Sequence, residues 1–199
     1  ADLFLFGDPE HWQILQAAIA LGRTWYYADH GYMGRYTYYR ITRNAFQHTG
    51  LSGRPDFRRL GRLGVMPAPW RKGGGHVLLC PPDVGFARLF GFDARVWLDR
   101  ATRELQLHTD RPIRIRHRAC SAPLADDLAG AHALVTWRSN AAVDALLAGV
   151  PVICTGDCAG AALGSRRFAD VESPIYPDHR EDWAARLAAN QWTLEEMRS

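Results

Sequence analysis

The sequence lacks any long uninterrupted hydrophobic run. No apolar stretch among its 199 residues approaches the roughly 20 residues that a membrane-spanning helix needs. Apolar residues still make up 47% of the chain and charged residues 23%, a balance that allows a buried core and argues against disorder. We therefore expect one folded domain or two small lobes, without a membrane segment.

Cysteine is scarce as well. The four cysteines (Cys80, Cys120, Cys154 and Cys158) are too few for a disulfide scaffold and form no Cys-x-x-Cys pair. Their spacing with His117 matches no common zinc pattern. We expect a reduced, cytoplasmic protein that needs neither a metal nor a cofactor.

Three motifs of nucleotide and nucleophile chemistry are absent. The chain has no P-loop, no Gly-x-Gly-x-x-Gly fingerprint and no Gly-x-Ser-x-Gly elbow. It contains no internal repeat and no low-complexity tract. These absences exclude the most common phosphate-binding loops and the serine-hydrolase turn, so any site must be found from other patterns.

Positive charge is concentrated in the first part of the chain. Residues 1–75 carry a net charge of +5 and are rich in aromatics, whereas residues 76–199 carry a net charge of −2. A basic, aromatic segment suits a polyanion such as nucleic acid.

The first 75 residues indicate a small α/β lobe. Residues 2–6 are predicted to form a buried strand, and residues 24–28 a second strand parallel to it. Between them, Asp8 and Pro9 indicate the start of a helix and Gly22 its end. A further strand is expected at 36–41. The glycine-, proline- and arginine-rich stretch 50–75 is expected to be a connection, which makes residues 1–72 the first lobe.

The second part alternates strand and helix more regularly. Strands are predicted at 77–80, 113–115, 133–136 and 150–154, and helices at 94–105, 124–131, 139–148 and 182–189. A capping box from Thr193 to Glu196 predicts one more helix. Residues 76–199 therefore form a second lobe with a parallel sheet covered on both faces. The predicted fold class is α/β, with two Rossmann-like lobes.

One turn of the second lobe is suited to an anion. Ser139 and Asn140 lie where a strand passes into a helix, and free N–H groups and the positive dipole end favour a negative group there. The alternative is an ordinary N-cap, since serine is a favoured capping residue in any helix.

This region resembles the C-terminal lobe of GT-B glycosyltransferases. The segment Ala-Leu-Leu-Ala-Gly-Val-Pro-Val at 145–152 is similar to theirs, most of all to the capsule-type Kdo transferases, and a small-residue loop follows at 157–164. The resemblance covers about residues 111–175. It implies a reduced GT-B-like architecture whose C-terminal lobe holds a nucleotide-sugar through Ser139 and Asn140.

A basic strand precedes that segment. Arg114, Arg116 and Arg118 alternate, so we expect them to share one face and to bind a phosphate or pyrophosphate. The Kdo transferases have a basic strand in this place, although their Lys-Pro-His-Pro form is absent here. A solvated edge strand is the alternative. The same resemblance implies that the Glu172 carboxylate binds the ribose hydroxyls of the donor. The alternative is that Glu172 is an ordinary charged residue of a loop.

The first lobe contains the candidate catalytic residues. Asp29 and His30 directly follow a predicted strand, where sites form in open α/β sheets. Asp29-His30-Gly31-Tyr32 resembles the acidic Asp-Gly-Phe segment of the Kdo transferases, which makes Asp29 a candidate base or nucleophile and His30 a second candidate base. The alternative is an Asp-His-Gly turn.

Aromatics and arginines are mixed just beyond this turn. Stacking on bases or sugar rings makes Arg35, Tyr38, Arg40 and Arg43 candidates for acceptor binding. Taken alone, this stretch fits an ordinary strand with half-buried aromatics better.

Together these observations predict a glycosyltransferase that uses a nucleotide-sugar. Asp29 would face Ser139 across a cleft, and arginines would stabilise the departing phosphate. The basic, aromatic first part favours a hydroxymethylated base in DNA as the acceptor, as for phage-type base glycosyltransferases. A polysaccharide or lipid-linked sugar, which the resemblance to the Kdo transferases favours, is the alternative acceptor. A non-catalytic module that binds a nucleotide or sugar, and a sugar-nucleotide epimerase, are the alternatives. The oligomeric state is left open.

Overall fold

The computed structural model describes residues 2–7, 12–48 and 53–198. They form two compact units, one made of residues 1–65 and 182–199 and the other of residues 66–181. Each unit combines helices with its own sheet, which confirms the α/β fold class. The last residues of the chain pack with the first unit, whereas the sequence placed them in the second lobe. The roles assigned to the two lobes stay predictions.

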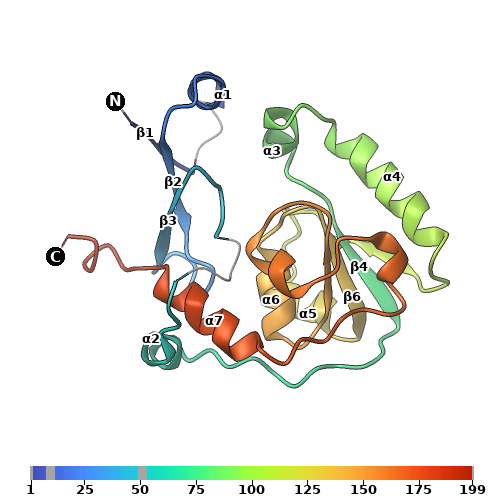
Figure 1. Cartoon of the computed structure of the whole chain (residues 1–199). Helices are drawn as coiled ribbons and strands as arrows, with labels where there is room; N and C mark the ends of the chain where they lie inside the picture. The colour runs from blue at the N-terminus through green and yellow to red at the C-terminus, as the bar shows by residue number, and fades with distance from the viewer. Residues whose placement is uncertain (1, 8–11, 49–52, 199) are drawn as a thin grey trace. The chain divides into compact units, whose positions relative to one another are not determined.

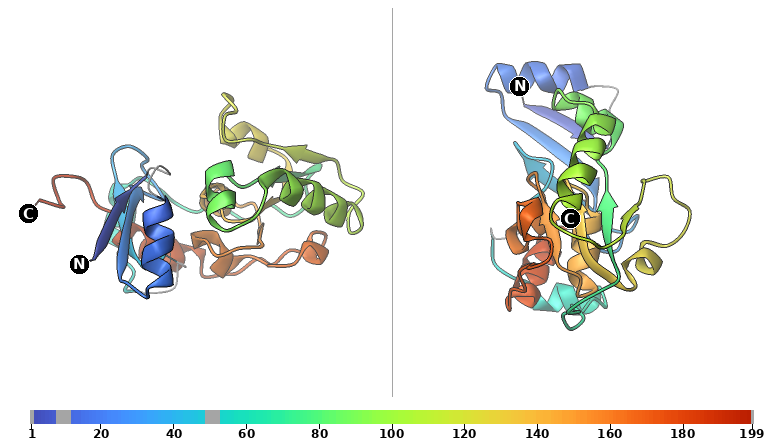
Figure 2. Two further views of the ribbon diagram at one scale, coloured as in Figure 1. Left: turned by 90° about the horizontal axis from the view of Figure 1, so that it is seen from above. Right: turned by 90° about the vertical axis from the view of Figure 1, so that its right-hand side faces the viewer.

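The first unit is built on a three-stranded sheet in the order β1-β2-β3 (Figure 1). Strands β1 (Leu3–Phe6) and β2 (Trp25–His30) are parallel, as predicted, and helix α1 (Trp12–Ala20) connects them. Strand β3 (Tyr39–Arg43) runs antiparallel to β2 and makes this sheet mixed. Figure 2 shows α1 lying along one face of the strands.

The core of the first unit lies under α1. Leu15 and Ala18 of α1 are buried, and the ring of Phe46 contacts those of Trp25 and Tyr27 at 5.0 Å between ring centres. Strand β1 was predicted to be buried, which is wrong, because it is an edge strand and Phe4 and Phe6 on its other face are exposed. The predicted helix start at Asp8 and Pro9 lies outside the described residues.

Two helices complete this unit, of which only the second was predicted. Helix α2 (Phe57–Arg62) interrupts the stretch expected to be a connection, and the side chain of Asp56 caps it by accepting the Arg59 N–H. Helix α7 (Arg180–Ala189) lies beside it, since Asp56 donates its N–H to Ala185 O. The capping box of Thr193 and Glu196 forms with both bonds, yet residues 193–198 make turns rather than the predicted helix.

The second unit contains a four-stranded parallel sheet in the order β5-β4-β6-β7, with all four strands near their predicted positions. The strands are β4 (His76–Cys80), β5 (Ile113–Ile115), β6 (Ala131–Thr136) and β7 (Val152–Cys154). The helices are α3 (Val84–Leu89), α4 (Ala94–Gln106), α5 (Leu124–Leu128) and α6 (Ala141–Leu147), followed by the 3-10 turns η2 (Ala159–Leu163) and η3 (Phe168–Asp170). Helix α3 was not predicted.

Helices cover both faces of this sheet. Every residue of β4 and β6 is buried. Leu79 and Val135 face Ala101 and Leu105 of α4 in one hydrophobic cluster, and α5 and α6 contact β6 on the other side. The prediction of a parallel sheet covered on both faces is therefore confirmed.

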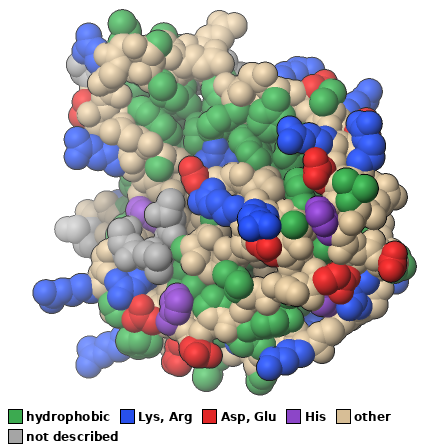
Figure 3. Space-filling model, turned by 45° about the vertical axis from the view of Figure 1, so that its right-hand side comes forward, with side chains coloured by type: hydrophobic (Ala, Val, Ile, Leu, Met, Phe, Trp, Pro, Cys, Tyr) green, Lys and Arg blue, Asp and Glu red, His purple; other side chains and the backbone are tan. Residues whose placement is uncertain are grey.

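The folded units do not keep the charge asymmetry of the linear sequence. The first unit has ten basic and eight acidic residues, a net charge of +2, because the acidic end of the chain joins it. The second has fourteen basic and thirteen acidic residues, a net charge of +1. Basic and acidic side chains are interspersed on the face drawn in Figure 3. Among the described residues, no helix is both long enough and apolar enough to span a membrane.

Candidate functional site

The strand order of the second unit defines where a ligand would bind. From β4 the chain crosses to β5 on one side of the sheet, then returns to place β6 and β7 on the other side. Between β4 and β6 the winding direction reverses, and the loops after these two strands leave in opposite directions. In open α/β sheets, ligands bind outside the carboxyl ends of the strands at such a reversal. We call this place the carboxyl edge: the loops that follow β4, β5, β6 and β7 (residues 81–83, 116–123, 137–140 and 155–158).

Ser139 and Asn140 lie in the carboxyl edge, as predicted. The N–H of Ser139 bonds to Thr136 Oγ1 at 3.3 Å, and its own Oγ accepts the Ala141 N–H at 3.2 Å. Thr136 Oγ1 donates to Cys80 O at 2.9 Å and thereby ties the ends of β6 and β4 together. Helix α6 begins at Ala141 and has seven residues, with Asn140 as an N-cap that makes no side-chain capping bond. The structure thus fixes this turn firmly by local hydrogen bonds.

The three arginines after β4 have different environments. Strand β5 ends at Ile115, so Arg116 and Arg118 follow it and do not alternate with Arg114 on one strand face as predicted. Arg116 is held internally by an ion pair with Asp127 and a 2.6 Å bond to Ala122 O, and therefore positions the 116–123 loop. The side chain of Arg118 is 72% exposed, 3.5 Å from Asp83. Arg114 and Arg118 are thus the two of the three that reach solvent.

An aromatic cluster in the carboxyl edge was missed at the sequence level. The ring of Trp137 makes edge contacts with Phe90 at 5.1 Å and with Phe92 at 4.6 Å between ring centres. The Arg138 guanidinium lies over Phe90 at 4.7 Å and over Trp137 at 5.1 Å. Phe90 and Phe92 come from the turn between α3 and α4, and the omission of α3 hid their proximity to Trp137.

Glu172 lies at the opposite end of the sheet. It accepts a hydrogen bond from Thr109 and pairs with Arg111 at 3.0 Å, and the two together hold the pKa of its carboxyl below the usual value, the Thr109 bond being the larger cause. The pocket that these residues line also includes Gly75 and Pro112, which precede β4 and β5. Grouping Glu172 with Ser139 at one donor site is therefore wrong: one lies at the amino ends of the strands and the other at their carboxyl ends.

The candidate catalytic residues belong to the first unit. Asp29 and His30 are the last two residues of β2 rather than the start of a turn. The Asp29 carboxylate is fixed at both oxygens: Oδ2 pairs with Arg40 at 2.7 Å, and Oδ1 accepts the N–H of His30 at 2.8 Å. The His30 ring contacts that of Tyr36 at 4.7 Å.

The predicted acceptor residues divide into buried and exposed ones. Arg40 is only 4% exposed; it donates to His30 O and lies over the Tyr32 ring at 4.6 Å. Its assignment to acceptor binding is wrong, because its guanidinium is used to hold the end of β2. Arg35 and Arg43 are exposed, and Tyr38 is half-buried. These three remain on the surface of the first unit.

The described residues contain no group of three or more histidine, cysteine or acidic side chains that could hold a metal ion. All four cysteines are unpaired thiols, and burial raises the pKa of Cys80 to about 12.

The fold consists of two α/β units, one of them a Rossmann-like parallel sheet with its helices. No protein-family model and no curated protein matches the sequence. A solved structure does match the fold: KpsC of Thermosulfurimonas dismutans, a beta Kdo 2,4 transferase, with a TM-score of 0.56 over 98% of this chain and 81% of that chain. The two sequences are 13% identical, so what they share is the fold.

Proposed function

We propose that this protein is a glycosyltransferase that moves a sugar from a nucleotide-sugar to a hydroxyl acceptor. The observation that carries the proposal is the match in fold to a Kdo transferase along 98% of the chain. A fold by itself hosts many functions, so the residues at the carboxyl edge supply the chemical argument.

The donor would bind at the carboxyl edge of the second unit. Arg118 is largely exposed there, and the hydroxyl of Ser139 and the amide of Asn140 can add hydrogen bonds to a phosphate. Arg114, on the exposed edge strand β5, is a further cation for this role. Arg116 would act indirectly, by holding the 116–123 loop through Asp127. Positive charge aimed at the leaving phosphate would stabilise the charge that develops there in the transition state.

Asp29 would act on the reacting sugar or on the acceptor hydroxyl, with His30 as the alternative base. The ion pair with Arg40 gives the Asp29 carboxylate one defined orientation, which suits a nucleophile or a charge-stabilising group. Arg35, Tyr38 and Arg43 are the surface residues available for the acceptor. That Asp29 faces Ser139 across a cleft stays a prediction.

The net charge of the first unit bears on the choice of acceptor. A DNA acceptor was suggested by the basic first part of the sequence, but the first unit has a net charge of only +2 once the residues that pack with it are counted. Phosphate neutralisation by many cations is what gives proteins their affinity for plain duplex DNA. A saccharide hydroxyl is therefore the acceptor we favour. Binding to duplex DNA that weakens steeply with added salt would instead favour a DNA acceptor.

The competing function is a module that binds a nucleotide or sugar without turnover. The observation in its favour is that both oxygens of Asp29 already have partners. Incubation with a panel of nucleotide-sugars distinguishes the two. A transferase should release free nucleoside mono- or diphosphate slowly, and Asp29→Ala should abolish the release while Arg23→Ala, at an exposed position of the same unit with no assigned role, leaves it unchanged. Stabilisation of the fold by a nucleotide without any release would support the binding module.

A further inference from the structure

The loop after β6 presents an aromatic ring at the place where the sheet reverses its winding. Trp137 is the first residue beyond β6, two positions before Ser139, and so belongs to the carboxyl edge. Its side chain is half-buried, and the neighbouring Phe90 keeps 45% of its surface exposed. Apolar aromatic surface is therefore available to a ligand at this edge.

The Trp137 ring is held by two other loops of this unit. Phe90 and Phe92 contact it from the turn after α3, with their planes at 80° and 86° to the indole. Gly156, from the loop after β7, lies so close that a Cβ at this position would be 2.5 Å from Trp137 Nε1. Gly156 also donates its N–H to Trp137 O at 2.7 Å. A ring braced in this way loses little conformational entropy when a ligand stacks on it.

Positive charge accompanies the ring. Arg138 lies over both Phe90 and Trp137. The exposed Arg118 belongs to the loop after β5, two strands from β6, and lies 3.5 Å from Asp83 in the loop after β4. An aromatic surface next to arginines fits a ligand that joins a planar π system to an anion. Nucleoside phosphates have this combination, with the base and the phosphate separated by one ribose.

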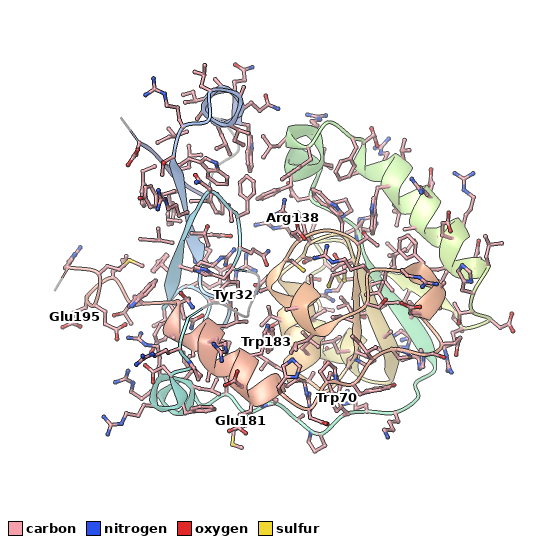
Figure 4. The ribbon with its side chains drawn as sticks, viewed as in Figure 1. Tyr32, Trp70, Arg138, Glu181, Trp183 and Glu195 are labelled. Carbon is pink, nitrogen blue, oxygen red and sulfur yellow. The ribbon has the colours of Figure 1, made fainter. Side chains whose placement is uncertain are left out.

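A second tryptophan of this unit provides the contrast. Trp70 is also half-buried, with Arg180 over its ring and Tyr176 in edge contact at 5.3 Å. It lies beside the carboxyl end of α6, away from the carboxyl edge of the sheet, since its chain neighbour Arg71 bonds to Gly149 O. Figure 4 labels Trp70 and Arg138 in separate parts of the unit. Arg180 is 3.7 Å from the centre of the Trp70 ring and covers that face, whereas Arg138 is 5.1 Å from the Trp137 centre.

We propose that Trp137 is the surface on which the base of the donor nucleotide stacks, with Arg138 beside it toward the phosphate. This inference rests on the proposed function, which requires a nucleotide-sugar, and it adds the part of the site that recognises the base. Stacking accepts any planar base, so Trp137 contributes affinity rather than a choice among bases.

Titration calorimetry with cytidine, uridine and adenosine monophosphates and with ribose 5-phosphate tests the inference. Ribose 5-phosphate has the sugar and phosphate but no base. Trp137→Leu should weaken the binding of the nucleotides about ten- to a hundredfold, the usual effect of removing one stacked ring. It should leave the binding of ribose 5-phosphate unchanged. Trp137→Phe keeps a ring and should retain most of the affinity, and the matched control Trp70→Leu should bind every ligand as the wild-type protein does.

A measurement on the unaltered side chain guards against misfolding of the variant. In the NMR spectrum of the wild-type protein, the indole N–H signal that disappears in Trp137→Phe should shift on addition of a nucleotide and stay in place with ribose 5-phosphate. If Trp137→Leu binds nucleotides as tightly as the wild-type protein, or if this signal does not respond to them, the inference is overturned while donor hydrolysis can still support the proposed function. If the wild-type protein binds none of the nucleotides, both are overturned.

Discussion

Replacing Arg180 by methionine should strongly destabilise the second unit. Arg180 is 8% exposed and donates two hydrogen bonds to carbonyl groups, at 2.7 Å to Leu146 O near the end of α6 and at 2.6 Å to Ala68 O. Its guanidinium also lies 3.7 Å from the centre of the Trp70 ring. Arg180→Met keeps the apolar stem and removes only the charged group, and it leaves both carbonyl groups without this donor.

The size of the loss follows from these contacts. A hydrogen bond from a charged donor contributes about 1.5–3 kcal/mol, and a desolvated cation–π contact about 2 kcal/mol. Burial of the guanidinium offsets part of this gain and lowers the pKa of Arg180. We therefore expect the free energy of unfolding to fall by about 3–5 kcal/mol, which corresponds to a fall in Tm of roughly 10 °C.

Urea denaturation followed by circular dichroism measures this difference. The matched control is Arg167→Met, because the Arg167 side chain is 76% exposed and lies 3.9 Å from Asp170; it should change the stability by less than about 0.5 kcal/mol. A loss below about 1 kcal/mol in Arg180→Met would show that the two carbonyl bonds do not stabilise the end of α6 as the structure implies.

Three further predictions follow from single residues. Gly149→Ala should lower the free energy of unfolding by about 2–4 kcal/mol in urea denaturation, because Gly149 has φ +78° and a Cβ there would lie 2.1 Å from Pro69 O. The control Gly75→Ala should leave the stability nearly unchanged, because a Cβ at Gly75 meets nothing within 4 Å. Burial lowers the pKa of His48 below its usual 6.5, so the stability contributed by its neutral form is complete above that pH and is lost as the pH drops below it. In thermal melts from pH 7.5 to 5, the loss of stability at low pH should therefore be smaller in His48→Gln than in the wild-type protein. The same pH dependence in both proteins would refute this role of His48. Arg116→Met should weaken donor binding without direct contact, by freeing the loop that Arg116 ties to Asp127, and should increase proteolytic cleavage within residues 116–123; cleavage at the wild-type rate would contradict this.

Periodicity and punctuation located most of the regular elements. The four strands of the second unit were predicted because a short apolar run bounded by turn residues is typical of a buried strand. Helix α1 and its end at Gly22 followed from the same logic, and Gly22 has the positive φ of +62° expected after a helix. Helices α2 and α3 were missed because both are six residues long, too short for a periodic pattern. Their N-caps, Asp56 and Asp83, were the signals available.

The candidate site was only partly accessible from the sequence. The Ser139 turn was found because it follows a strong strand pattern, and Asp29 because it lies at a strand end. The partners of the charged side chains could not be predicted, because they depend on which strands and loops lie next to each other in the fold. Arg40 was expected on the surface, yet the antiparallel register of β3 places it against Asp29. Glu172 was grouped with the donor residues from its position in the chain, although it lies at the amino ends of the strands.

Crystals of the protein grown with a cytidine or uridine nucleotide test the central claim most directly. The account predicts electron density for the nucleotide at the carboxyl edge, against residues 137–140 and 155–158, with the phosphate within reach of Arg118. Density in the pocket lined by Arg111 and Glu172 at the other end of the sheet, with none at the carboxyl edge, would contradict it.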